Sequence, residues 1–253
     1  MAAAIELQQK TVDELAQREN EDMRRVEETL EKLGFSAKDR DIAILPAFTR
    51  PLVGMSDKRK HALAERLAEI AAEISLGPRE ENTASYEVTS APETTTGHVA
   101  YGCATCGGYC CKNGADRAYL TRQTLTRVLA SSGATLEDVL RTYLERVPAQ
   151  SHADSCIYHT DRGCNLPFEM RSDTCNDFFC TGIRSLTSTV GDNASQQVIA
   201  AAVKGNRVVR LALIDGAQMN YLLNESNRVR ENGHSQAEPE DRADVKGVEP
   251  ETF

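Results

Sequence analysis

Apolar residues recur at helical spacing in two stretches of the first third of the chain. In residues 56–76 the apolar stripe has intervals of four, three and four, and its members are Leu63, Leu67, Ile70 and Ile74. An earlier stretch begins at a capping box formed by Thr11 and Glu14 and ends near Gly34. Each stretch predicts an amphipathic helix. Two short apolar runs, each containing a proline, are interpreted as connections: residues 42–46 and 51–54.

The second half of the chain has three further segments with helical patterns and one with a strand pattern. Helices are predicted over residues 121–133 and 135–147, each opening on a threonine that is well placed to cap it. A third helix is predicted over 195–203, stopped by a glycine at 205. Residues 207–214 are rich in β-branched side chains and predict a strand followed by an Asp-Gly turn.

These elements predict a mainly α fold around an irregular, cysteine-rich core organised by bound metal, with a short β element near 206–214. The predicted domain organisation has four parts. They are an N-terminal helical segment (1–77), a polar linker (78–97), a cysteine-cluster metal-binding domain with a C-terminal helix and strand (98–223) and a disordered acidic tail (224–253).

Composition narrows the classes of partner. The 253 residues are 40% hydrophobic and 26% charged, which is ordinary for a globular protein, and no run is long and apolar enough to span a bilayer. A formal charge of -9 without a basic stripe argues against nucleic acid. The first residues lack a secretory signal, so we expect a cytoplasmic protein with reduced thiols and no membrane partner.

The candidate chemistry lies in the cysteines, and the eight candidate metal ligands are Cys103, Cys106, Cys110, Cys111, Cys156, Cys164, Cys175 and Cys180. In a reducing compartment, clustered cysteines bind metal or act in redox chemistry more often than they form structural disulfides. The CxxC spacing of the first two lets sulfurs from one tight turn reach one ion, and Gly107-Gly108 lets the backbone bend sharply beside them.

The adjacent pair Cys110-Cys111 leaves the arrangement of ligands open, because the side chains of neighbouring residues diverge. Eight thiols are enough for two four-cysteine zinc sites, for one iron–sulfur cluster with thiols to spare, or for a clustered site with bridging sulfurs. Thiolate ligands carry negative charge that cations can offset. The basic residues near the cysteines are Lys112, Arg117, Arg162, Arg171 and Arg184, with Arg171 the foremost candidate.

Catalytic interpretations are weaker than metal binding. His152 and His159 flank Cys156, which suggests a cysteine nucleophile with a histidine base, but a thiol held by a metal is not free to attack. Asp173 and Asp177 flank Cys175 and are interpreted as local capping groups. The sequence contains no phosphate-binding loop, no Ser-His-Asp arrangement and no HExxH motif.

The order of the cysteines resembles the YkgJ-type CxxCxxCC family of zinc- or iron-chelating proteins. The segments that carry the resemblance are Cys103-x2-Cys106-Gly-Gly-Tyr-Cys110-Cys111, Cys156-Ile-Tyr, Cys164 and Arg171-Ser-Asp-Thr-Cys175-Asn-Asp-Phe-Phe-Cys180. They cover about a third of the chain. This chain has three residues where the family has two between its second and third cysteines, and Ser172 replaces the family's proline. The resemblance implies metal chelation without an established reaction.

Three functional hypotheses follow. The first is a metal-binding protein of undetermined physiological role, with zinc or iron, including an iron–sulfur cluster, as the bound species. The second is an iron–sulfur-dependent redox or protein methyl-transfer enzyme. Some relatives of the resembled family are linked to protein-lysine methylation, a connection that does not transfer without matching residues. The third is an adaptor that binds a protein partner through its N-terminal helices.

Overall fold

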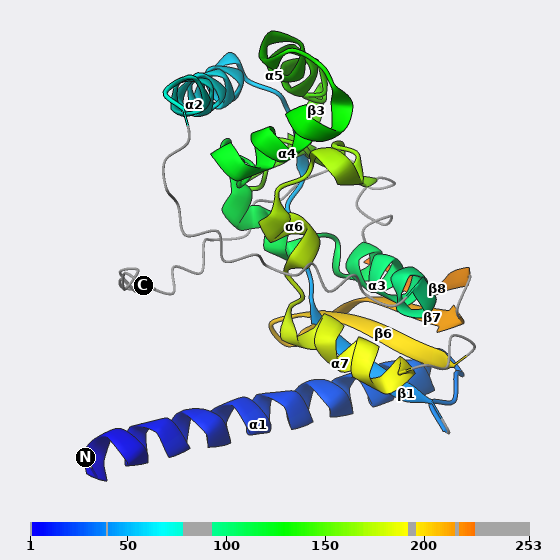
Figure 1. The fold of residues 1–253 in the computed structure, drawn as a ribbon. Helices are drawn as coiled ribbons and strands as arrows, with labels where there is room; N and C mark the ends of the chain where they lie inside the picture. Colours follow the sequence, from blue (N-terminus) through cyan, green and yellow to red (C-terminus); the bar gives the residue numbers. More distant parts are fainter. Residues whose placement is uncertain (1, 39, 78–92, 192–195, 216–217, 226–253) are drawn as a thin grey trace.

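The computed structural model describes residues 2–38, 40–77, 93–191, 196–215 and 218–225. Figure 1 shows that their helices and strands form two groups. The sheet module consists of β1 (Asp41–Pro46), β6 (Gln197–Lys204), β7 (Arg207–Asp215), β8 (Gln218–Asn224), α1 (Ala2–Lys32), α3 (Glu93–Cys106) and α7 (Thr181–Val190). The helical module consists of α2 (Asp57–Ser75), α4 (Arg122–Ser132), α5 (Leu136–Glu145), β2 (Leu52–Gly54), β3 (Gln150–His152), β4 (His159–Thr160), β5 (Gly163–Cys164), η2 (Phe168–Met170) and α6 (Asp173–Asp177). The 3-10 helix η1 (Tyr109–Gly114) connects α3 to the helical module.

The sheet module is built on a mixed four-stranded sheet of order β1-β6-β7-β8. β1 runs parallel to β6, with Asp41 opposite Val198, and the other two pairs are antiparallel. Alternate residues of β6 face opposite layers: Val198 packs in a cluster with α3 and α7, whereas Ile199 packs in a cluster with Leu30 of α1. Helices therefore cover both faces of the sheet, as Figure 1 shows.

The helical module has its own apolar core. The largest side chains that are fully buried in it include Leu63 and Ile70 of α2, Leu125 of α4, and Tyr143 and Tyr158. Both tyrosine hydroxyls donate to main-chain carbonyls, Tyr143 to Met170 at 2.7 Å and Tyr158 to Tyr143 at 2.9 Å. These bonds attach the irregular segment 150–177 to α5.

The mainly α prediction is wrong, because the fold is mixed α/β and residues of its sheet take part in three apolar clusters. The helix predicted over 195–203 is strand β6. Its run of alanines suits a helix, but β6 lies between two layers and is buried on both faces, so it lacks the alternation that marks a half-exposed strand. The runs interpreted as connections are strands β1 and β2.

Other predicted elements are confirmed. The strand predicted over 207–214 is β7, and it pairs with strands on both sides. The helices predicted over 56–76, 121–133 and 135–147 are α2, α4 and α5, each capped by the side chain of the preceding Ser or Thr. The first predicted helix is α1, but this helix begins at Ala2, so Thr11 lies inside it and is not its N-cap.

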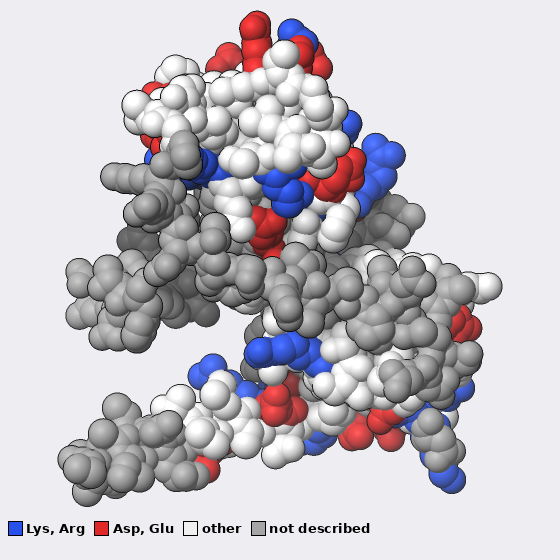
Figure 2. Space-filling model, viewed as in Figure 1, with Lys and Arg blue, Asp and Glu red and all other residues white. Residues whose placement is uncertain are grey.

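Some predicted segments fall outside the described residues. These are residues 78–92 of the linker and 226–253 of the tail, while 93–97 belong to α3 and Asn224 ends β8. None of the described helices combines the length and the apolar character needed to cross a bilayer. On the face drawn in Figure 2, basic and acidic side chains of the described residues are interspersed. The absence of a nucleic-acid partner stays a prediction.

Candidate metal centre

All eight cysteines carry free thiols and lie in the described residues. Cys103 and Cys106 lie on the last turn of α3, and not on the tight turn that the CxxC spacing predicted. Because residues three apart share a helix face, their side chains lie on one side of α3. Cys110 and Cys111 lie on η1, and the other four lie between residues 156 and 180.

Packing distributes the cysteines between the two modules. Cys106 is buried in the cluster formed by α3, α7 and the sheet, and Cys180 packs against the same cluster. Cys156 is buried in the core of the helical module, with Cys111 and Cys164 against it. As the side chains lie, no three His, Cys, Asp or Glu residues of the described part converge closely enough to hold an ion. The metal-organised core predicted from the sequence is therefore absent from the described residues.

The thiols of the first group still affect one another. Burial raises the pKa of Cys106 to about 11, against the hydrogen bond from the Tyr109 amide, which reaches the sulfur at 3.3 Å. The charges of Cys110 and Cys180 also raise it. Cys103 is exposed at the surface, yet desolvation of its thiol raises its pKa to about 12, with contributions from Cys106 and the same two neighbours.

A second group of thiols surrounds Cys156. Burial raises the pKa of Cys156 to about 12, and the charges of Cys164 and Cys175 contribute. Cys110 and Cys111 are hydrogen-bonded through their thiols, which lowers the pKa of Cys110 and raises that of Cys111. This adjacent pair is thus the place where the two groups meet.

Two consecutive glycines follow the CxxC segment at the end of α3, with φ of +75° at Gly107 and +77° at Gly108. A Cβ at Gly107 would lie 2.7 Å from the Arg210 guanidinium, and one at Gly108 would lie 2.6 Å from Nε2 of His159. The predicted sharp bend is confirmed, and the glycines also admit two side chains from distant segments.

Arg210 of β7 is buried behind this bend. Its Nε donates to the Thr105 carbonyl at 2.6 Å, and its Nη2 donates to the carbonyls of Cys106 at 2.7 Å and Phe48 at 2.9 Å. The guanidinium therefore lies at the carboxyl end of α3, where a cation is favourable. Burial lowers its pKa, and the charges of Tyr221 and Cys106 oppose that effect. Sequence analysis missed Arg210, although an arginine amid the apolar residues of a strand is a visible signal.

Arg59 of α2 has a similar position beside the other buried thiol. It forms an ion pair with Asp116 and donates to the Ser151 hydroxyl at 2.6 Å and to the Ser155 carbonyl. Its charge lowers the pKa of Cys156, opposing the effect of burial. Arg59 lies on the polar side of a regular helix, so no signal in the sequence marked it.

Arg171, the cation singled out from the sequence, lies within electrostatic reach of both groups. Its charge acts to lower the pKa of Cys103 and of Cys175, both of which are raised mainly by desolvation. The guanidinium also donates to the Leu166 carbonyl at 3.0 Å. Lys112, by contrast, donates to the Tyr109 hydroxyl.

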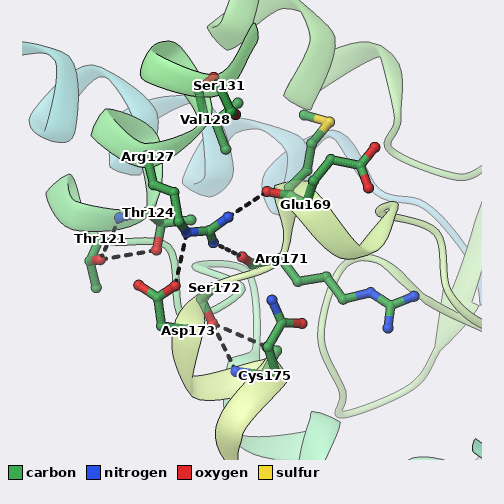
Figure 3. A network of polar contacts seen from close by, with 12 residues as sticks. Thr121, Thr124, Arg127, Val128, Ser131, Glu169, Arg171, Ser172, Asp173 and Cys175 are labelled. Atoms are coloured by element: carbon green, nitrogen blue, oxygen red, sulfur yellow. Dashed lines mark hydrogen bonds and ion pairs between the residues drawn. The ribbon is translucent and has the colours of Figure 1, made fainter. Parts of the chain in front are cut away.

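Arg127 positions α6, the helix that carries Cys175. Figure 3 shows Arg127 of α4 reaching the Asp173 carboxylate at 3.0 Å and main-chain carbonyls of segment 169–171. Asp173 thus forms an ion pair. Ser172 caps α6 by accepting from the Cys175 amide, and its hydroxyl donates to the Cys175 sulfur at 3.2 Å. The thiol is therefore held near α4.

The structure gives the histidines partners other than Cys156. His159 is buried, its Nδ1 is bonded to the Ser155 hydroxyl at 2.7 Å, and its ring lies 4.6 Å from that of His152. Both rings also contact Phe48. Burial, followed by the charge of His152, lowers the pKa of His159 to about 4. The geometry therefore does not arrange a histidine base on the Cys156 thiol.

Fold and site together define a mixed α/β protein in which eight free thiols gather where two modules meet. No protein-family model, curated protein or solved structure matches this chain. The resemblance to the YkgJ-type family therefore stays a prediction, and it rests on the order and spacing of the cysteines.

Proposed function

We propose that this protein binds metal ions, zinc or iron, through its cysteine thiolates. The observation that carries the proposal is the gathering of eight free thiols, drawn from α3, η1 and residues 156–180, in which neighbouring cysteines raise the pKa values of Cys103, Cys111 and Cys156. Thiolate sulfur is a preferred ligand of zinc and of iron in proteins. The donor set therefore fits either metal.

Binding requires the side chains to turn toward a common point. Cys103, Cys110 and Cys175 are exposed, so rotation about χ1 changes no packed core. The buried Cys106 and Cys156 stay where packing holds them. Rotation of surface thiols toward fixed, buried ones is a small rearrangement compared with refolding.

Positive charge is already in place for such a site. Four thiolates on a divalent ion leave a net charge of about -2, which is costly away from water unless cations or amide donors compensate it. Arg210, Arg59 and Arg171 interact electrostatically with thiols of the cluster. These three residues support the ion without being ligands.

The test is anaerobic purification of the full chain followed by elemental analysis and a visible spectrum. We expect at least one equivalent of zinc or iron per chain, removed by a chelator. Colourless protein with zinc favours structural or carrier binding, whereas brown protein with labile sulfide favours the iron–sulfur enzyme. Protein that is metal-free, takes up no added zinc or iron and has eight titratable thiols contradicts the proposal.

We also propose a cytoplasmic location, supported by the free thiols of all eight cysteines. Rapid alkylation in intact cells, followed by mass spectrometry, tests this. Thiols that are alkylated or metal-protected are expected, and disulfide-linked peptides contradict the proposal.

A further inference from the structure

The chain crosses between the two modules twice within the cysteine cluster. The first crossing is η1, which leaves the sheet-side cluster after Cys106 and enters the helical module at Cys111. The second lies between α6 and α7, after Cys175 and before Cys180. At each crossing, thiols lie on both sides of the boundary.

Tight packing fixes the sheet-side thiols relative to one another. A Cβ at Gly102 of α3 would lie 2.7 Å from Leu186 and 2.8 Å from Ile183, so α3 and α7 are in close contact. Cys103 follows Gly102 on α3, and Cys180 is the residue that immediately precedes α7. The contact between the helices therefore keeps the end of α3, which carries Cys103 and Cys106, close to the start of α7, which Cys180 precedes.

Main-chain bonds fix the other group. The Cys156 amide donates to the Cys111 carbonyl at 3.0 Å, and Cys164 pairs with His159 in the β4–β5 ladder. Cys164 thus lies in a short hairpin whose His159 amide donates to the Cys156 carbonyl, and Cys156 is itself bonded to η1. Cys175 is kept on the same side because Arg127 ties α6 to α4, as Figure 3 shows.

We infer that the cysteines form two separate ion sites, one on each module. The sheet-side set is Cys103, Cys106, Cys110 and Cys180, and the helix-side set is Cys111, Cys156, Cys164 and Cys175. This inference rests on the proposed function. Each set contains one buried cysteine, Cys106 or Cys156, and at least one exposed cysteine.

The adjacent cysteines Cys110 and Cys111 are assigned to different sites. Both lie on η1, which leads from the end of α3 to the helical module, and their thiols are hydrogen-bonded to each other. Cys111 belongs to the helix-side set because its carbonyl accepts from the Cys156 amide, and Cys110, which precedes it on the side of α3, belongs to the sheet-side set.

The first test titrates the reduced, metal-free full chain with cobalt(II) alone under anaerobic conditions, following thiolate-to-cobalt absorption. We expect saturation at two equivalents. Saturation at one equivalent, or at three or more, overturns the two-site division. An absence of any binding overturns the proposed function itself, so the two failures are distinguishable.

The sharpest variants are neighbours in sequence, Cys110→Ser and Cys111→Ser. Loss of a supporting hydrogen bond can weaken metal affinity by roughly 100-fold. We expect each substitution to weaken the binding of one cobalt equivalent by more than this and to leave the binding of the other unchanged. The double variant with Cys110→Ser and Cys180→Ser should still bind the one cobalt equivalent that Cys110→Ser binds. The double variant with Cys110→Ser and Cys111→Ser should bind neither equivalent tightly. Loss of both equivalents in either single variant overturns the inference.

A measurement on the unaltered chain covers the case in which a variant fails to fold. Loaded with two equivalents of cadmium-113, the protein should give two resonances without cadmium–cadmium coupling, because no thiolate bridges the ions. Coupled resonances would reveal bridging sulfur and overturn the division into separate sites.

Discussion

The two modules satisfy their buried main-chain polar groups in different ways. In the sheet module the ladders of β1, β6, β7 and β8 pair the backbone. In the helical module, segment 150–177 has only two- and three-residue strands, and side chains from the surrounding helices donate to its carbonyls. The donors are Arg59, Arg127 and Tyr143. An irregular, cysteine-bearing segment can thus be ordered by side-chain hydrogen bonds where no ladder is available.

The largest expected effect comes from removing one core leucine in each module. Leu186 and Leu125 are both fully buried, so Leu186→Ala and Leu125→Ala should each lower the free energy of unfolding by about 2–5 kcal/mol, measured by urea denaturation. Because their clusters are separate, amide hydrogen exchange should rise first in the altered module. An equal rise in both modules would show that they form one cooperative unit.

A smaller difference is expected between the two arginines that bind carbonyls. Arg210 is buried, so Arg210→Met removes the guanidinium donor from the Thr105 and Phe48 carbonyls, while the Cys106 carbonyl keeps the Phe48 amide, and it should cost about 2–4 kcal/mol. Arg127 is partly exposed and water can replace it, so Arg127→Met should cost about 1 kcal/mol. Urea denaturation of both variants measures this difference.

The control for Arg210 lies on the same strand. Arg207 is exposed, and Arg207→Met should change stability by less than about 0.5 kcal/mol. If Arg127→Met proves as costly as Arg210→Met, side-chain hydrogen bonds matter more to the helical module than burial alone indicates.

The same contrast explains how much was predictable from sequence. α2 was predictable because its apolar stripe has a single period, set by one buried face. β6 was not, because segments far away in the chain cover both its faces and remove the alternation. All eight cysteines were visible as candidate ligands. Their distribution between modules was not, because it depends on α6 packing toward α4 and α7 toward α3.

The smallest expected effect concerns His159, which lies against Gly108 in the segment that connects the two modules. Burial lowers its pKa from the ordinary 6.5 to about 4, so between these values the unfolded chain binds the proton more readily than the folded one. Stability that is present above pH 6.5 is therefore lost as the pH falls toward 4. Between pH 7 and pH 6 the loss should be about 0.7 kcal/mol.

Urea denaturation of the reduced, metal-free protein at pH 7, 6.5 and 6 measures this loss. Without bound metal, competition between protons and metal for the ligands does not contribute to the pH dependence. His159→Gln removes the titrating group, so its pH dependence should be weaker than that of the unaltered chain by this amount. His61 is exposed on α2, and His61→Gln should keep the original dependence. If the free energy of unfolding of His159→Gln depends on pH as strongly as that of the unaltered chain, burial does not hold the His159 imidazole neutral, and another group takes up the proton.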